Sequence, residues 1–202
     1  NENKFGQIFS AQINIPWWRE QSYYDEPGRG TYKRDGGGVL ISQAIHTLDL
    51  AISLLGDVKD VMVMAETTKF HKMESENFVT GGIKFKNSVI ASLFASTSVF
   101  PGSSESIVLH CENATVKLEA GTLIINWRNG KKEEFGEESG TGGSADPMAF
   151  PFDWHKDLIL NFAKSINTNK KFEITGKEAL KVHYLIDAMI ESSKKNKLIT
   201  ME

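Results

Sequence analysis

Four polar side chains are spaced so that a single helix face would carry them. Residues 39–55 are largely apolar and end at Gly56, which is typical of a helix closed by a glycine cap. The polar positions within this helix are Ser42, His46, Asp49 and Ser53. Spacings of four, three and four residues place them on one face. A histidine on such a stripe can act as a general acid or base, and an aspartate one turn later can fix its tautomer.

Three glycines, Gly36–Gly38, precede this helix. They would let the chain approach a ligand closely, and the helix N-terminus beyond them favours an anionic or carbonyl group. The same pattern also fits a structural histidine bonded to a carbonyl group, with Asp49 as its partner or in solvent. We expect no metal site, because none of the five histidines lies three or four residues from another His or Cys.

The elements around this helix predict an α+β fold. Residues 5–15 alternate apolar and polar side chains as a strand does, and Pro16 ends the run. Seven further strands are predicted at 58–67, 77–85, 88–98, 104–111, 114–118, 122–127 and 131–135, the last two joined by the hairpin signal Asn129-Gly130. Helices are predicted at 151–166 and 176–193. Segregated elements with short turns predict one large, mostly antiparallel sheet with helices packed on one face.

Composition limits the class of partner. The 202 residues suit one large domain, and a net charge of −3 provides no broad basic surface for nucleic acid. No segment reaches the roughly 20 consecutive apolar residues that span a bilayer. A single cysteine, Cys111, fits an inert core thiol and a reducing, cytoplasmic setting. Consecutive apolar residues in 61–64 and 89–91 predict that a second subunit or another domain covers the far face of the sheet.

Other residues carry less information. The segment 16–35 is rich in aromatic residues, and its Pro and Gly residues predict a loop. We expect this loop to do more than connect two elements. His155 follows a Gly- and Ser-rich loop at 137–149 and is a candidate second site residue, although an amphipathic histidine at a helix start explains it equally well. His71 is assigned to the surface and His110 to a strand.

Residues 36–50 read Gly-Gly-Gly-Val-Leu-Ile-Ser-Gln-Ala-Ile-His-Thr-Leu-Asp-Leu, and this run resembles the signature of the Gfo/Idh/MocA oxidoreductase family. The segment from Trp18 to Tyr32 is similar to the family's substrate loop, and the segment from Trp154 to Ser192 is similar to its C-terminal helix pair. The resemblance therefore covers about residues 5–200.

The resemblance implies that residues 1–202 are a single substrate-binding and oligomerisation domain. It is of the type found in the C-terminal domain of glyceraldehyde-3-phosphate dehydrogenase. The N-terminal Rossmann domain of the family, which binds NAD or NADP, is absent from this chain. In the family, the histidine that corresponds to His46 acts as, or assists, the acid or base at the reacting hydroxyl or carbonyl. A lysine of the absent domain usually shares that work.

The resemblance also assigns roles to the neighbouring residues. Several family dehydrogenases carry Asp where this chain has Ser42. A serine cannot be a carboxylate base, so proton transfer would depend on His46 and the absent lysine. Asp49 would orient His46 or hold a substrate hydroxyl. The candidates for contacting substrate hydroxyl or phosphate groups are Arg19, Tyr24, Arg29 and Thr31.

We therefore expect the substrate-binding half of an NAD(P)-dependent oxidoreductase. It would transfer hydride to or from a sugar, cyclitol or nucleotide-sugar, and it would form a homo-oligomer through the uncovered sheet face. The alternative is a non-catalytic sugar-binding or scaffolding module that kept the fold, with Ser42 as a sign of decay. A Gly-rich dinucleotide turn encoded upstream would favour the enzyme.

Overall fold

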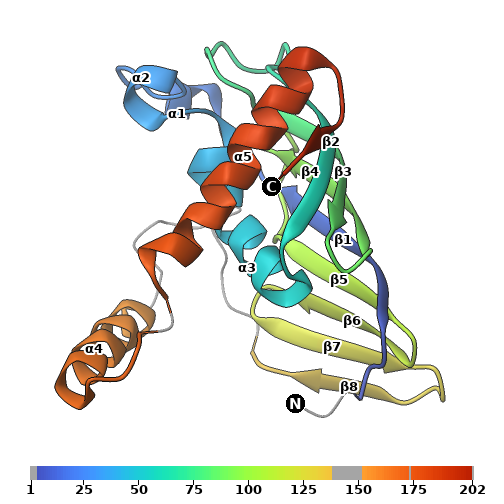
Figure 1. The fold of residues 1–202 in the computed structure, drawn as a ribbon. Helices are drawn as coiled ribbons and strands as arrows, with labels where there is room; N and C mark the ends of the chain where they lie inside the picture. The colour runs from blue at the N-terminus through green and yellow to red at the C-terminus, as the bar shows by residue number, and fades with distance from the viewer. Residues whose placement is uncertain (1–3, 138–151, 173, 202) are drawn as a thin grey trace.

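The structure, a computed structural model, describes residues 4–137, 152–172 and 174–201, and these form a nine-stranded sheet with helices against one face (Figure 1). The strand order is β8-β7-β6-β5-β1-β4-β3-β2-β9. The strands are β1 (Ile8–Pro16), β2 (Val58–Glu66), β3 (Phe78–Phe85), β4 (Ile90–Ser96), β5 (Ser106–Cys111), β6 (Ala114–Glu119), β7 (Thr122–Trp127), β8 (Lys132–Phe135) and β9 (Ile199–Thr200). Only the pairing of β1 with β4 is parallel among these described strands. The predicted α+β class with a mostly antiparallel sheet is confirmed.

The predicted strands lie within a few residues of the observed ones because alternating burial accompanies each run. The Asn129-Gly130 turn joins β7 to β8 as predicted, with Gly130 at φ +87° and its N–H donating to the Trp127 carbonyl at 3.0 Å. The sequence pattern missed β9, a two-residue strand that pairs with Asp60 and Val61 of β2. So short an element has no periodicity of its own.

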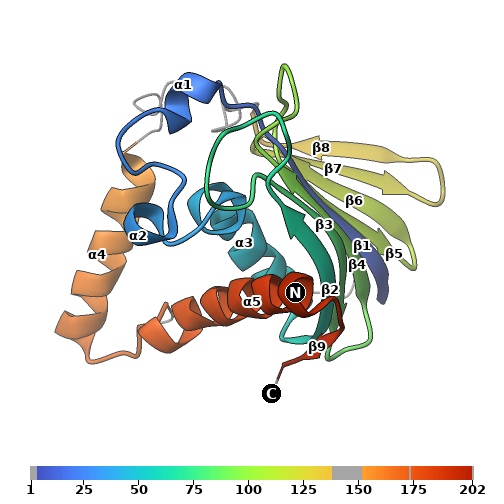
Figure 2. The ribbon, with the colours of Figure 1, turned by 90° about the horizontal axis from the view of Figure 1, so that it is seen from above.

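The helices are unequal in length and in packing. They are α1 (Gln21–Tyr24), α2 (Tyr32–Asp35), the π-helix η1 (Leu40–Ala44), α3 (Ile45–Leu55), α4 (Asp153–Thr168) and α5 (Gly176–Lys195). Figures 1 and 2 show α3 and α5 on the same face of the sheet, with α5 alongside β2. By length and composition alone the stretch Tyr32–Leu55 could cross a membrane, but 56% of its apolar window is buried, because its apolar side chains belong to the core.

Helix α5 is attached to the sheet by an apolar face and by two serines. The side chains that it buries are Val182, Leu185, Ile186, Ala188, Met189 and Ser192. Ser192 Oγ accepts the Val63 N–H at 3.2 Å, and Ser193 Oγ accepts the Ala65 N–H at 2.8 Å. Thr175 is the N-cap of this helix, since its side chain accepts the Glu178 N–H. The buried face begins at Val182, because Ala179 in the first turn is exposed.

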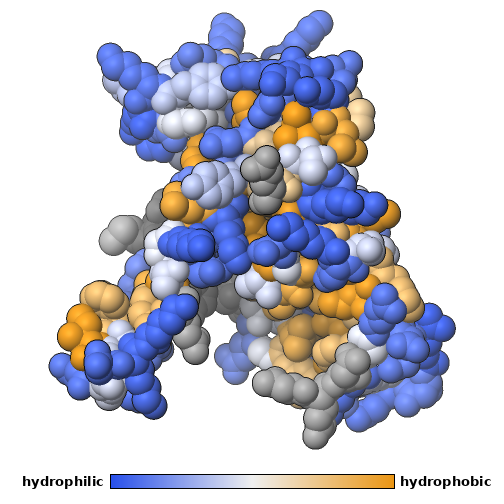
Figure 3. Space-filling view, in the orientation of Figure 1, coloured by the Kyte–Doolittle hydropathy of each residue, from blue (hydrophilic) through white to orange (hydrophobic). Residues whose placement is uncertain are grey.

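Helix α4 does not pack on the sheet as the predicted arrangement required. Figures 1 and 2 show it projecting from the body, and Figure 3 shows hydrophobic residues on its surface. Leu158, Phe162 and Ile166 share one face of the helix at four-residue spacing, and all three are exposed. The Gly- and Ser-rich segment predicted at 137–149 lies, apart from residue 137, outside the described residues.

The sheet face opposite α3 and α5 carries exposed apolar side chains, and no described segment of the chain covers them. The side chains of Met62, Met64 and Ile90 are each more than half exposed. They come from β2 and β4, where the alternate residues are apolar and buried on the helix side. The two-sided apolar pattern of the sequence therefore corresponds to a face that none of the described residues covers.

Candidate active site

The helix that carries His46 begins at a buried carboxylate. Glu76 Oε1 accepts the N–H groups of Gly38 at 3.2 Å and Leu40 at 3.1 Å, and the Glu76 carbonyl accepts the Val39 N–H at 2.8 Å. Burial raises the pKa of Glu76 above its ordinary value, although these N–H groups oppose that shift. The N-terminal position where the sequence suggested a ligand anion or carbonyl is occupied by the chain's own side chain.

The three glycines serve this internal contact. A Cβ atom at Gly38 would lie 1.8 Å from the Glu76 carbonyl oxygen, so only glycine allows the two backbones to approach so closely. The glycines were expected to let a ligand approach. At Gly38, the group that approaches is instead the chain's own backbone at Glu76. No local pattern pointed to Glu76, because it lies 38 residues along the chain.

The first turn of the predicted helix is a π-helix rather than an α-helix. It spans Leu40–Ala44, and Ser42 lies within it. Gln43, in the same turn, is buried, and its Oε1 has no hydrogen-bond partner among the described residues. Turns of this kind are rare and occur often at functional sites. The helix as a whole, closed by Gly56 with its N–H bonded to the Ile52 carbonyl, matches the prediction.

The polar stripe faces solvent. Ser42, His46, Asp49 and Ser53 are all exposed, whereas the opposite side of the helix is buried in the core. The described residues offer neither the His46 ring nor the Asp49 carboxylate a hydrogen bond, so the expected His46–Asp49 bond is not formed. An exposed imidazole without a partner is free to bond a substrate oxygen.

His46 lies at the edge of a hollow of about 230 Å³. Helix α3 contributes His46, Thr47 and Leu50 to its wall, the start of β5 contributes residues 105–107, and the β6–β7 turn contributes residues 118–121. Figure 3 shows hydrophobic residues over this end of the sheet. The carboxylate of Glu105 is held at the hollow by the Trp17 indole N–H, which donates to Glu105 Oε2 at 3.1 Å.

In the aromatic loop, residues 16–35, two guanidinium groups lie over aromatic rings. The Arg19 guanidinium lies 5.2 Å from the Trp17 ring centroid and 5.6 Å from that of Tyr23. The Arg29 guanidinium also lies over the Tyr23 ring, 4.2 Å from its centroid, and it donates to the Tyr23 hydroxyl at 2.8 Å. Arg29 also forms an ion pair with Glu26. The structure thus joins two predicted substrate contacts, Arg19 and Arg29, through Tyr23.

Two other predicted contacts, Tyr24 and Thr31, have structural bonds. Tyr24 is buried, its hydroxyl bonds Thr97 Oγ1 at 2.8 Å, and burial raises its pKa to about 12. Thr31 Oγ1 donates to the Gly28 carbonyl at 2.6 Å and accepts the N–H of Arg34, which caps α2. These bonds give both residues a role in shaping the loop.

The surface assignment of His71 is wrong. The residue is 4% exposed, its Nε2 lies 2.9 Å from the Arg19 carbonyl, and its Nδ1 lies 2.7 Å from Asn77 Nδ2. Because the amide group of Asn77 is a donor at Nδ2, Nδ1 must accept and Nε2–H must donate. His71 is therefore a neutral imidazole that holds the loop at Arg19, a long-range contact that the sequence does not reveal.

His155 is not brought to His46. It is exposed on α4, which Figures 1 and 2 show apart from α3. Asp49 and Ser53 instead border a different hollow, of about 520 Å³, with Ile174 and Lys181 at the start of α5. The predicted set therefore divides between the His46 hollow, the aromatic loop and this second hollow.

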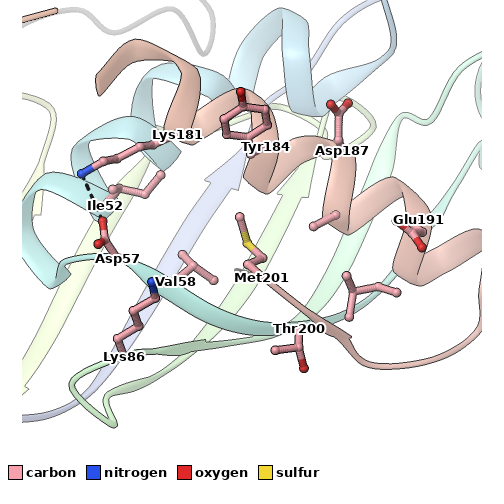
Figure 4. Close-up of a pocket in the computed structure, with 12 residues that line it drawn as sticks. Ile52, Asp57, Val58, Lys86, Lys181, Tyr184, Asp187, Glu191, Thr200 and Met201 are labelled. Carbon is pink, nitrogen blue, oxygen red and sulfur yellow. Dashed lines mark ion pairs between the residues drawn. The ribbon is translucent and has the colours of Figure 1, made fainter. Parts of the chain in front are cut away.

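A groove between α5, β2 and β9 is larger but offers less chemistry (Figure 4). Its volume is about 570 Å³. Lys181 is already paired with Asp57 at 3.1 Å and with Glu178 at 2.8 Å. The groove has no histidine in its wall, and we do not assign it a function.

The described residues do not fit a dinucleotide or a metal. They contain no group of three metal-ligating side chains. The N-terminus of the long buried helix, where a pyrophosphate would bind, is filled by the Glu76 carboxylate.

The fold is that of an α+β domain in which a large mixed sheet carries helices against one face. Residues 1–117 match the family model of the GFO/IDH/MocA C-terminal domain, and the chain belongs to this family. The protein YMR315W of Saccharomyces cerevisiae is 26% identical over 171 residues, which are 79% of this chain and 47% of that protein.

Solved structures share the fold over the whole chain. The WlbA dehydrogenase of Bordetella pertussis, in complex with NADH and UDP-GlcNAcA, has a TM-score of 0.77 and 23% identity. Levoglucosan dehydrogenase in complex with NADH and levoglucosan has a TM-score of 0.81 and 16% identity. Both match 100% of this chain, which covers 56% and 60% of their lengths. The chain thus spans about half the length of its relatives.

Proposed function

We propose that this chain is the substrate-binding half of an NAD(P)-dependent oxidoreductase that acts on a sugar, cyclitol or nucleotide-sugar. His46 would give a proton to the reacting oxygen or take one from it. A nicotinamide cofactor, bound by the Rossmann domain of the family, would supply or accept the hydride. This chain's own residues would orient the substrate and handle the proton.

The observation that carries the proposal is the position of His46. Its ring is exposed, has no hydrogen-bond partner among the described residues, and borders a hollow of about 230 Å³. The backbone that supports it is held by the Glu76 cap and by a buried apolar face. A free imidazole on a rigid helix is what proton transfer to a bound substrate requires.

The remaining stripe residues would have supporting roles. The Ser42 hydroxyl can donate and accept a hydrogen bond but cannot act as a carboxylate base, so the proton would move through His46. Asp49 is exposed and borders the hollow at the start of α5, where it could hold a substrate hydroxyl. The related structures with bound NADH support a nicotinamide cofactor for the whole protein.

We also propose that the uncovered sheet face joins two copies of the chain. Met62 and Met64 on β2 are 51% and 63% exposed, and Ile90 on β4 is 58% exposed. Exposed apolar patches of this kind mark interaction sites. A second copy presenting the same face would bury it symmetrically.

The test uses the protein together with its cofactor domain. Reduced-nicotinamide absorbance is followed with NAD and NADP against a panel of sugars, cyclitols and nucleotide-sugars. With an active substrate, His46→Ala should lower kcat by roughly 10²–10⁴-fold. His183→Ala, which removes an exposed imidazole on α5, is the matched control and should retain activity. Wild-type turnover in the His46→Ala variant would refute the role of His46, and no turnover with any member of the panel would favour the binding module.

A further inference from the structure

The hollow beside His46 contains a carboxylate that the proposed proton transfer does not use. Glu105 lines it from the start of β5, and only Oε2 is bonded, by the Trp17 indole. The other carboxylate in the wall, Glu119, is neutralised by Lys117 at 2.6 Å. Glu105 has no such cation among the described residues, so its charge is compensated by one indole N–H alone.

The position of Glu105 is set by the backbone. Trp17 donates its N–H to the Ser96 carbonyl at 2.9 Å, and its own carbonyl accepts the Val99 N–H at 3.1 Å. Its ring packs against the core. The indole therefore fixes Oε2 and leaves Oε1 without a partner at the hollow that His46 borders. An ionised carboxylate can only accept hydrogen bonds, so the ligand group it suits must be a donor.

The rest of the wall narrows the class of ligand. Leu50, Ile107 and Leu118 supply apolar surface between the polar groups. A volume of about 230 Å³ is below the roughly 300–1,000 Å³ of pockets for drug-sized ligands, so the hollow suits a single small ring. A carboxylate or phosphate on that ring would meet the unneutralised charge of Glu105 and be disfavoured.

We propose that Glu105 is a specificity-determining residue that accepts hydrogen bonds from the hydroxyl groups of a neutral polyhydroxylated ring. This inference rests on the proposed function, because it places the ring whose oxygen His46 would serve. Glu105 takes no part in proton transfer; it selects a ring that carries hydroxyl donors over one that lacks them. A site built around such an acceptor rejects analogues without the donor, because a bound ring would displace water from the carboxylate and leave its Oε1 unpaired.

The competing explanation is that Glu105 merely anchors Trp17. Glu105→Gln separates the two, since a glutamine keeps an oxygen to accept the indole N–H but loses the charge. Glu105→Asp keeps the negative charge but shortens the side chain by one methylene group, which moves the carboxylate away from the hollow. Glu133→Gln is the matched control, because Glu133 Oε2 likewise accepts an indole N–H, from Trp127 at 3.0 Å, and Glu133 does not line the hollow.

The experiment titrates the chain, labelled with ¹⁵N-tryptophan, with levoglucosan, myo-inositol, D-glucose and D-glucuronate. The Trp17 indole N–H resonance, assigned from a Trp17→Phe variant, reports the Glu105 bond directly. At least one neutral ring should shift this resonance saturably, and D-glucuronate should bind more weakly. Glu105→Gln should weaken binding of the neutral ring by roughly 10- to 100-fold, Glu105→Asp should weaken it less, and Glu133→Gln should leave it unchanged.

Equal affinity in wild type and Glu105→Gln, or no shift with any neutral ring, would overturn the inference. The assay needs no cofactor, so its result is separable from that of the hydride-transfer test. If a neutral ring binds through Glu105 and the whole protein transfers no hydride, the inference stands and the proposed function fails. If hydride is transferred and the KM of Glu105→Gln equals that of wild type, the proposed function stands and the inference about Glu105 fails.

Discussion

Replacing Gly38 with alanine should destabilise the fold where the His46 helix begins. The added Cβ would lie 1.8 Å from the Glu76 carbonyl oxygen and 2.7 Å from its carbonyl carbon, whereas Cβ contacts under 3.0 Å essentially never occur. The two backbones must therefore separate by at least 1.2 Å, the difference between 3.0 and 1.8 Å. A flexible side chain cannot absorb this movement, because both contacted atoms belong to the backbone.

The cost follows from the bonds that cross this contact. The Val39 N–H reaches the Glu76 carbonyl over 2.8 Å, and an added 1.2 Å would stretch it to about 4 Å, beyond hydrogen-bonding range. The Gly38 and Leu40 N–H groups depend on the Glu76 side chain at 3.2 and 3.1 Å. Losing two to three buried bonds, some to a charged group, should cost about 3–5 kcal/mol.

Urea denaturation followed by circular dichroism measures this cost. With a slope of about 2–3 kcal/mol per molar, the midpoint should fall by roughly 1–2 M. Gly82→Ala is the matched control, since its Cβ would meet only the Ala91 carbonyl oxygen at 3.9 Å, and it should change stability by no more than about 0.5 kcal/mol. A loss below about 1 kcal/mol in Gly38→Ala would refute the close contact with Glu76.

Three further outcomes follow from buried and exposed groups. The folded-state pKa of Glu76 lies above 4.5, so its proton stabilises the fold at low pH, and this contribution is lost as pH rises through the folded pKa. Urea denaturation at several pH values should therefore show Glu76→Gln gaining stability relative to wild type as pH rises above 4.5; a constant difference would contradict this. Tyr24→Phe leaves the Thr97 hydroxyl unpaired and should cost about 1–2 kcal/mol in the same assay, and no loss would contradict the buried bond. Met64→Asp should shift the chain toward monomer in analytical ultracentrifugation, whereas Ile166→Asp, at 64% against 63% exposure, should not; an unchanged mass in both would argue against the sheet interface.

The elements themselves were readable from local pattern. Strands such as β2 and β3 alternate in burial along their length, and helix α3 repeats apolar residues at helical spacing up to a glycine cap. These signals are local because the period of a strand or helix is set by its own backbone geometry. The face that carries Ser42, His46 and Asp49 followed from the same arithmetic.

The long-range contacts that hold the site in place could not be predicted from the sequence. Glu76 caps the helix from 36 to 38 residues away, His71 reaches the Arg19 carbonyl across 52 residues, and Glu105 is held by Trp17 across 88. None of these pairs follows a periodicity, because each depends on how separate strands meet in space. The same reason explains why His155, predicted near the site, lies on a helix that stands apart from it.

For Ser42, His46 and Asp49, the sequence determined one part of the arrangement and the tertiary structure determined the rest. The spacing of the sequence determined that these side chains share one helix face, since helical geometry requires it. Only the tertiary structure decided that this face is exposed, that His46 and Asp49 border different hollows, and that the anion position at the helix start is occupied by Glu76. Local geometry places residues on an element, but only packing between distant segments determines what surrounds them.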